Sequence, residues 1–249
     1  MKKKFFALAI VACLGIFFLI DFAQAVIGTP VLRGTGGSLA VATTATTTFT
    51  PSANDLLLAM VYARTGAATA PTISDDLGGI WAEISNSSVD AGNVVGRIFY
   101  QVIGASPAAM LVTGVSTGAL QTAIAVVSVS GAGIDFSNFN RSTGTTGDAT
   151  TTMAAYQATS IAIEFYASNA GGASSPPSGF TELYDSALAS NLRGSISYDM
   201  VAPTTTLIRA NTGTDVILYG LEVKEPPTPN PRIIRLRGGI RLLGGMRLQ

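Results

Sequence analysis

The residue types that are missing from the chain limit its chemistry. There is no histidine, and the single cysteine, Cys13, lies in an apolar segment near the N-terminus. A Ser-His-Asp triad, a Cys-His pair and histidine-ligated zinc are therefore excluded. Hydrolysis by paired carboxylates stays open, because glycosidases need two acids about 5–10 Å apart. Glu164 on one expected strand, with Glu182 and Asp185 on another, can form such a pair. The alternative is that these acids face solvent on half-exposed sheets.

A second group with binding chemistry lies between residues 75 and 81. Asp75 and Asp76 precede Gly78 and Gly79, and Trp81 follows. Calcium prefers such oxygens, but it needs about six to eight ligands and no D-x-D-x-D-G pattern is present. An Asx turn that caps a strand is the alternative interpretation. Trp81 can stack on a sugar or fill the core of a sandwich. We expect no metal or cofactor, and Asp75, Asp76 and Trp81 are the candidate ligand-binding residues.

The C-terminal residues 232–249 contain a short arginine repeat. RLRGGI at 235–240 is followed by RLLGGM at 241–246 and by RLQ. The glycine pairs exclude a stable helix, since each glycine costs about 1 kcal/mol relative to alanine, and they allow turns between short strands. The candidate assembly or anchoring residues are Arg235, Arg237, Arg241 and Arg247.

Three uses of this tail are open. It can add a strand to a neighbouring copy of the chain, it can approach an anionic surface, or it can pack on its own domain or be disordered. Residues 26–225 contain seven basic and fourteen acidic residues (7 − 14 = −7), whereas the residues that follow contain five arginines and no acid. Because the main domain is acidic and exported, nucleic acid is not an expected partner. A second copy, or a cell or virion surface, is expected instead.

Residues 1–25 have the pattern of an export signal. Lys2, Lys3 and Lys4 precede an apolar run over 5–20, and Ala23-Gln24-Ala25 supplies small residues for cleavage. The run is shorter than the ~20 residues of a membrane span, so cleavage after Ala25 is expected and an uncleaved anchor is the alternative. A lipidated Cys13 is disfavoured, because the apolar run continues beyond it. The protein is therefore predicted to be exported, either secreted or at the cell surface, and membrane-anchored if the signal stays.

The remaining chain is predicted to be one all-β domain over 26–225. Charged residues make up 12% and apolar residues 47% of the sequence, which is unlike a disordered chain. Once the signal is removed no cysteine remains, so no disulfide is expected. Proline-rich residues 226–231 form a spacer. Threonine-, serine- and glycine-rich segments at 43–48, 142–152 and 170–178 are interpreted as surface loops. Strands are expected at 38–42, 46–49, 55–63, 81–87, 94–103, 109–115, 121–130, 161–167, 181–188, 194–201, 205–210 and 215–224.

Alternation along these strands predicts their faces. Ile98, Tyr100 and Val102 share one face, as in a one-sided antiparallel strand. Residues 56–61 and 124–127 are apolar on both faces, which is typical of central strands that are covered on both sides. The prediction is a two-sheet antiparallel sandwich with a hydrophobic signal helix before it and the arginine- and glycine-rich tail after it.

Several short motifs carry a family resemblance. They are NDLLLA at 54–59, ISDDLGG at 73–79 with Trp81, Phe99-Tyr100, 123–129 with Gly131, GFT at 179–181, and Ser197-Tyr198. Together they resemble jelly-roll or concanavalin-lectin-like β-sandwich modules of secreted bacterial and phage surface proteins. The resemblance covers roughly 26–224. It implies a structural or adhesive unit that in some cases binds carbohydrate, and it implies no catalytic residue.

The sequence thus predicts an exported, non-enzymatic structural or adhesive surface protein whose tail mediates assembly or attachment. A carbohydrate-binding module is the first alternative. A carboxylate-dependent glycosidase is the second.

Overall fold

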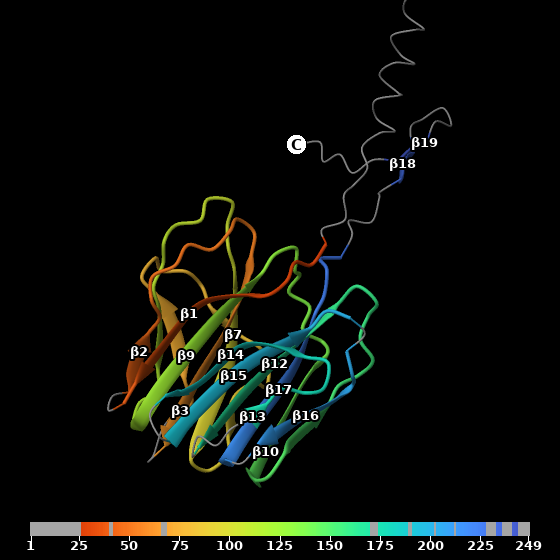
Figure 1. Cartoon of the computed structure of the whole chain (residues 1–249). Coiled ribbons are helices and arrows are strands. Elements are labelled where there is room, and N and C mark those ends of the chain that lie inside the picture. Colours follow the sequence, from red (N-terminus) through yellow and green to blue (C-terminus); the bar gives the residue numbers. More distant parts are fainter. Residues whose placement is uncertain are drawn as a thin grey trace, which may run out of the picture. The chain divides into compact units, whose positions relative to one another are not determined.

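The structure is a computed structural model that describes residues 26–39, 42–65, 69–169, 174–188, 191–201, 203–211, 213–227, 233–235 and 241–243 (Figure 1). Residues Val26–Pro227 form one compact unit. Its strands are β1 (Val31–Ser38), β2 (Thr43–Ala45), β3 (Leu56–Thr65), β4 (Thr72–Asp75), β5 (Ala82–Glu83), β6 (Val89–Asp90), β7 (Val94–Val102), β8 (Val112–Val115), β9 (Ala119–Val129), β10 (Phe139–Thr146), β11 (Ala149–Thr152), β12 (Ile161–Asn169), β13 (Ser174–Ser175), β14 (Thr181–Leu188), β15 (Leu192–Asp199), β16 (Thr206–Asn211) and β17 (Thr214–Val223). The prediction of an all-β, antiparallel fold is confirmed.

The unit contains the same strand arrangement twice. In the first half the strand order is β1-β9-β3-β7-β5, and a three-stranded sheet β2-β8-β4 accompanies it. In the second half the order is β10-β17-β12-β15-β14, accompanied by β11-β16-β13. The turn before the central strand is also repeated. Asp55 N–H donates to Ser52 O at 3.3 Å before β3, and Ser160 N–H donates to Gln157 O at 3.1 Å before β12. The two halves can therefore be compared position by position.

Three apolar cores stack between the sheets. The central core joins the two large sheets and takes alternate residues of their strands, among them Met60, Tyr62, Phe165 and Tyr219. The opposite faces of β3 and β9 pack against β8 through Val61, Ile124 and Val112. In the second half, β12 and β17 pack against β16 through Tyr166, Leu218 and Leu207. Strands β3 and β9 are thus covered on both faces, as their continuous apolar runs predict.

Two glycines let the large sheets approach each other. A Cβ added at Gly194 on β15 would overlap the ring of Tyr62 on β3, and one added at Gly96 on β7 would overlap the Tyr219 hydroxyl on β17. Since Tyr62 and Tyr219 are completely buried, their rings fill the space that these glycines leave open. The close approach explains why glycine occurs in the middle of two strands, where it otherwise weakens a sheet.

Several strands differ from the predictions. β4 and β6 were not predicted, β2 and β13 lie within the loops predicted at 43–48 and 170–178, and the strand expected at 46–49 is only a bridge between Phe49 and Met110. The strand expected at 38–42 lies earlier, at Val31–Ser38, and contains three glycines. A side chain at Gly36 would collide with the backbone of Ala45 on β2, so the crossing of these strands requires glycine. The predicted loop at 142–152 is also wrong, because it forms most of β10 and all of β11. β10 is an edge strand with a largely exposed, polar sequence, which hides its strand character.

The C-terminal tail contains a second, separate piece of structure. β18 (Ile233–Arg235) and β19 (Arg241–Leu243) form an antiparallel hairpin in which Arg235 is paired with Arg241. This agrees with the expected turns between short Arg-Leu strands. The predicted signal at 1–25 lies outside the described residues, as do Arg237 and Arg247.

Candidate functional site

Asp75 builds the turn between β4 and β5. Its Oδ1 atom accepts hydrogen bonds from Leu77 N–H at 3.0 Å and Gly79 N–H at 2.9 Å. Its Oδ2 atom accepts the indole N–H of Trp81 at 2.8 Å. These are the bonds of an Asx turn with a tryptophan attached to it. The structure therefore brings Asp75 and Trp81 together, but the carboxylate is occupied by the turn that it stabilises.

The other members of the predicted ligand site also make internal contacts. Asp76 Oδ1 accepts Leu111 N–H at 2.8 Å and ties the turn to the start of β8. Trp81 is half-buried and packs on the core between β3 and β8. A shallow depression of about 160 Å³ lies beside the turn, and Asp75, Leu77 and Gln101 line it with Ile103. Neither Asp76 nor Trp81 is among its lining residues, so the three predicted residues do not form one binding surface.

The predicted carboxylate pair lies around a buried arginine. Arg209 on β16 is completely buried and donates from Nη1 to Glu164 Oε2 at 2.9 Å. Its Nη2 atom lies 3.3 Å from Glu182 Oε2 and also donates to the hydroxyl oxygens of Ser174 and Ser195. Glu164 is itself completely buried, so the interpretation that it faces solvent is wrong.

This geometry does not suit hydrolysis. A glycosidase needs a sugar and a water molecule between its two carboxylates, whereas here the Arg209 guanidinium bridges them. Glu164 Oε2 also accepts the Ser197 hydroxyl at 2.6 Å. Burial raises the pKa of Glu164, while the charge of Arg209 and the Ser197 hydrogen bond lower it, and the net direction is upward. The third acid, Asp185, is paired with Arg193 on the neighbouring strand β15.

The buried pair is particular to the second half of the domain. In the first half, Thr44 on β2 lies opposite Gly114 on β8 in the strand register. At the equivalent place in the second half, Ala149 on β11 lies opposite Arg209 on β16. Counting from the repeated turn, Ala59 on β3 corresponds to Glu164 on β12. The first half thus has alanine and glycine where the second has glutamate and arginine. The Arg209 guanidinium carbon lies 5.0 Å from the centre of the Tyr166 ring. At the equivalent place in the first half, Gly114 lies against the Val61 side chain.

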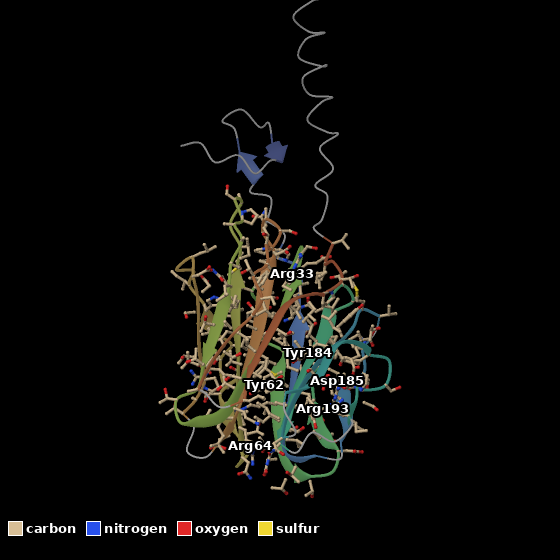
Figure 2. All side chains as sticks on the ribbon, turned by 60° about the vertical axis from the view of Figure 1, so that its left-hand side comes forward. Arg33, Tyr62, Arg64, Tyr184, Asp185 and Arg193 are labelled. Atoms are coloured by element: carbon tan, nitrogen blue, oxygen red, sulfur yellow. The ribbon has the colours of Figure 1, made fainter. Side chains whose placement is uncertain are left out.

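A polar contact also crosses the central core. The hydroxyls of Tyr62 on β3 and Tyr184 on β14 lie 3.3 Å apart, and Figure 2 labels both residues together with Asp185 and Arg193 in the same part of the domain. Burial is the largest cause that raises the pKa of both tyrosines, so both stay neutral at physiological pH. The pair satisfies polar atoms that would otherwise cost stability in an apolar core.

Both ends of the compact unit are attached to one loop. At its start, Gly28 N–H donates to Ser130 O at 2.9 Å, and Gly131 lies against the Val26 carbonyl. At its end, Gly133 N–H donates to Lys224 O at 2.7 Å, and Gly133 lies against Pro226. In Figure 1 the red start and the blue end of the domain lie next to each other. The first and last residues of the domain are therefore held at the same loop.

This relationship was not predicted from the sequence. Its only local signals are Gly131, with a φ of 66°, and Gly133. At Gly131 the φ value and the nearby Val26 carbonyl both favour glycine, and at Gly133 a side chain would press on Pro226. Among the residues that the structure describes, no helix has the length and hydrophobicity required to cross a membrane. In the same part of the chain, no three metal-binding side chains of His, Cys, Asp or Glu gather.

Comparisons of the chain with protein-family models, with curated proteins and with solved structures give no match.

Proposed function

We propose that this protein is an exported, non-enzymatic β-sandwich domain that is attached to a cell or virion surface by its terminal segments and acts there as a structural or adhesive unit. The observation that carries the proposal is the contact of both ends of the domain, at Val26–Gly28 and Lys224–Pro226, with residues 130–133. A domain held at one end leaves its other surfaces open to the surroundings. This is what a displayed structural or adhesive unit requires.

The chain ends differ in a way that suits attachment. The segment before Val26 has the composition of an export signal or anchor, and the segment after Pro227 contains five arginines and no acid. From Pro227 to Ile233 the chain spans at most about 20 Å when extended. The linker between the domain and the hairpin of β18 and β19 is therefore short. We assign attachment, or assembly with a second copy, to this tail.

The lectin-like resemblance supports an adhesive role but does not establish a jelly roll. The large facing sheets agree with a sandwich, and the repeated order β1-β9-β3-β7-β5 adds an outer three-stranded sheet to each of them. We propose the jelly-roll-like description as the finer form of the fold. The bridged carboxylates Glu164 and Glu182 favour a non-enzymatic protein over a glycosidase.

The experiment is a truncation after Glu225. We expect the truncated chain to keep its unfolding midpoint and to change either its association state or its retention at the surface. A matched variant with glutamine at all five tail arginines separates the effect of charge from that of chain length. An unchanged monomer that is retained as well as the full chain would contradict the proposal.

A further inference from the structure

An open crevice of about 280 Å³ lies where the two halves of the domain meet. Residues of the first half line it on one side, and residues 136–141 of the second half line it on the other. It is separate from the Asp75 turn and from the buried Arg209 cluster. The lining residues are Ser85, Asn86, Phe136, Ser137, Phe139, Asn140 and Arg141.

Two aromatic rings give the crevice a rigid apolar surface. Phe136 and Phe139 are half-buried, and each rests on a tyrosine of the large sheets. The Phe136 ring meets Tyr100 edge-on, with centroids 4.8 Å apart, and the Phe139 ring stacks on Tyr219 at 6.1 Å. Aromatic pairs of this kind resist rearrangement, because their contacts extend into the core. The rings are thus held in place before any ligand arrives.

A strained turn presents an amide group at the same place. Ser87 N–H donates to Ile84 O at 2.9 Å and closes the turn, and Asn86 within it has a φ of 64°. The Ser87 hydroxyl is bonded to both backbone groups of Ile98 at 3.1 Å, which fixes the turn on β7. Asparagine tolerates this left-handed backbone better than most residues but less well than glycine. The exposed Asn86 side chain therefore stands at a position that glycine would occupy with less strain.

The second half supplies the remaining polar groups. Lys224 Nζ donates to Asp135 Oδ2 at 3.1 Å and to the Ser137 hydroxyl at 2.7 Å, which holds the approach to β10 in place. Asn140 Nδ2 donates to Thr152 O at 2.6 Å. Arg141 donates from Nη1 to the carbonyl of Ser88, so it links β10 to the first half. It is the one charged residue among those that line the crevice.

We infer that this crevice binds a saccharide. The C–H face of a sugar ring packs on aromatic rings, and its hydroxyls bond to amides, hydroxyls and guanidinium groups, all of which line this surface. Its volume is just below the ~300–1,000 Å³ of most small-molecule sites, which suits a sugar unit of a longer glycan. A polynucleotide would require a basic stripe rather than one arginine. The ligand class is a neutral saccharide, or one with a single acidic group that meets Arg141.

This inference goes beyond attachment, because it gives the exported domain a ligand of its own. It is tested on the full chain with a glycan array, followed by calorimetric titration of the glycans that bind. Asn86→Gly removes the side-chain amide and relieves the backbone strain, so the variant is expected to fold. It is expected to bind about tenfold more weakly, because a tenfold change in affinity corresponds to about the free energy of one good hydrogen bond. Phe136→Leu is expected to weaken binding by a similar factor.

The matched control is Asn54→Gly. Asn54 also has a positive φ, of 63°, and lies outside the crevice, so this variant is expected to keep full affinity. No binding to any glycan would overturn the inference. Binding that survives both Asn86→Gly and Phe136→Leu, or that falls equally in Asn54→Gly, would overturn it as well. Because tail truncation leaves the crevice intact, a failure of attachment and a failure of binding are measured separately.

Discussion

Arg209 Nη1 lies 2.9 Å from Glu164 Oε2, and both side chains are completely buried. Removal of one partner from such a pair leaves an uncompensated charge in the core, which costs much more than the net value of the pair itself. The first half of the domain shows the alternative, because Ala59 and Gly114 occupy the equivalent positions without any charge. The pair is therefore a feature of the second half rather than a requirement of the fold.

We expect Arg209→Leu to lower the free energy of unfolding by about 3–5 kcal/mol, because Glu164 would stay buried without its partner. The double variant with Glu164→Ala should lose less than the sum of the two single variants. Urea unfolding of the four proteins gives this coupling. Additive losses would show that the two side chains do not act as a pair.

The pH dependence of stability should change in Glu164→Gln. Because the pKa of folded Glu164 is raised above its usual 4.5, the folded protein binds this proton more tightly than the unfolded chain. Glu164 therefore stabilises the folded state fully below its usual pKa of 4.5. This stabilisation is lost as the pH rises through the folded pKa. The stability of the wild type relative to Glu164→Gln should therefore decrease as the pH rises from 4.5 through the folded pKa. An increase over this range would contradict the raised pKa.

Glu222 should behave in the opposite way. Burial is the largest single influence on the pKa of Glu222 and raises it. The hydrogen bonds from Gln157 N–H, Ser160 and Asn138 together lower the pKa by more, so the net shift is downward. Its contribution to stability is then present above the usual pKa and lost as the pH falls through the folded value. Relative to Glu222→Gln, the wild type should lose stability on acidification. Chemical unfolding of both proteins across the acid range measures the sign, and a gain of wild-type stability on acidification would contradict it.

Gly194→Ala should destabilise the domain by about 1–3 kcal/mol, because the new methyl group overlaps the Tyr62 ring. Tyr62→Leu removes the ring and should recover part of this loss in the double variant. A surface glycine with open space around it, Gly104, provides the matched control as Gly104→Ala. If Tyr62→Leu gives no recovery, the close approach of β15 to β3 is not the cause.

Trp81 is the only tryptophan, so tryptophan fluorescence, excited selectively over that of the tyrosines, reports on the Asp75 turn. Asp75→Ala removes the acceptor of the indole N–H and two backbone bonds. We expect a loss of about 1–3 kcal/mol and a red-shifted emission as the ring becomes more exposed. Asp76→Ala, which removes only the bond to Leu111, should leave the emission unchanged. An unshifted spectrum in Asp75→Ala would mean that packing alone positions Trp81.

The sequence predicts this fold well where strands alternate or are wholly apolar. Residues 94–103 and 215–224 are predicted almost to their ends, because their apolar residues mark them as strands. The one-sided burial expected for β7 is wrong, since Ile98 packs in the central core and Phe99 on the opposite face packs in the core between β3 and β8. β1 and β10 were missed, since their glycines and hydroxyl residues serve a strand crossing and an exposed edge. Those requirements arise from contacts with β2 and from solvent, and they leave no local period in the sequence.

The sites were harder to predict, because their partners are distant in the chain. The Asx turn at Asp75 was foreseen as an alternative, since all of its atoms lie within a few residues. Arg209 was not connected with Glu164, because β16 and β12 are joined only through the packing of the second half. The repeated strand order was also missed. The two halves share the order in which their strands pair, but equivalent positions carry different residues, such as Ala59 and Glu164. The meeting of Val26 and Pro226 at one loop depends on the complete topology.

The most direct test of the account is the location of the protein in cells that produce the full chain, the chain truncated after Glu225, and the five-arginine-to-glutamine variant. Antibody detection in the medium and on intact cells separates released from attached protein, and urea unfolding confirms that each chain is folded. We expect the full chain on the cell surface and both variants released into the medium with unchanged unfolding midpoints. Full-length protein that remains inside the cell, or variants retained as well as the full chain, would contradict an exported domain attached through its tail.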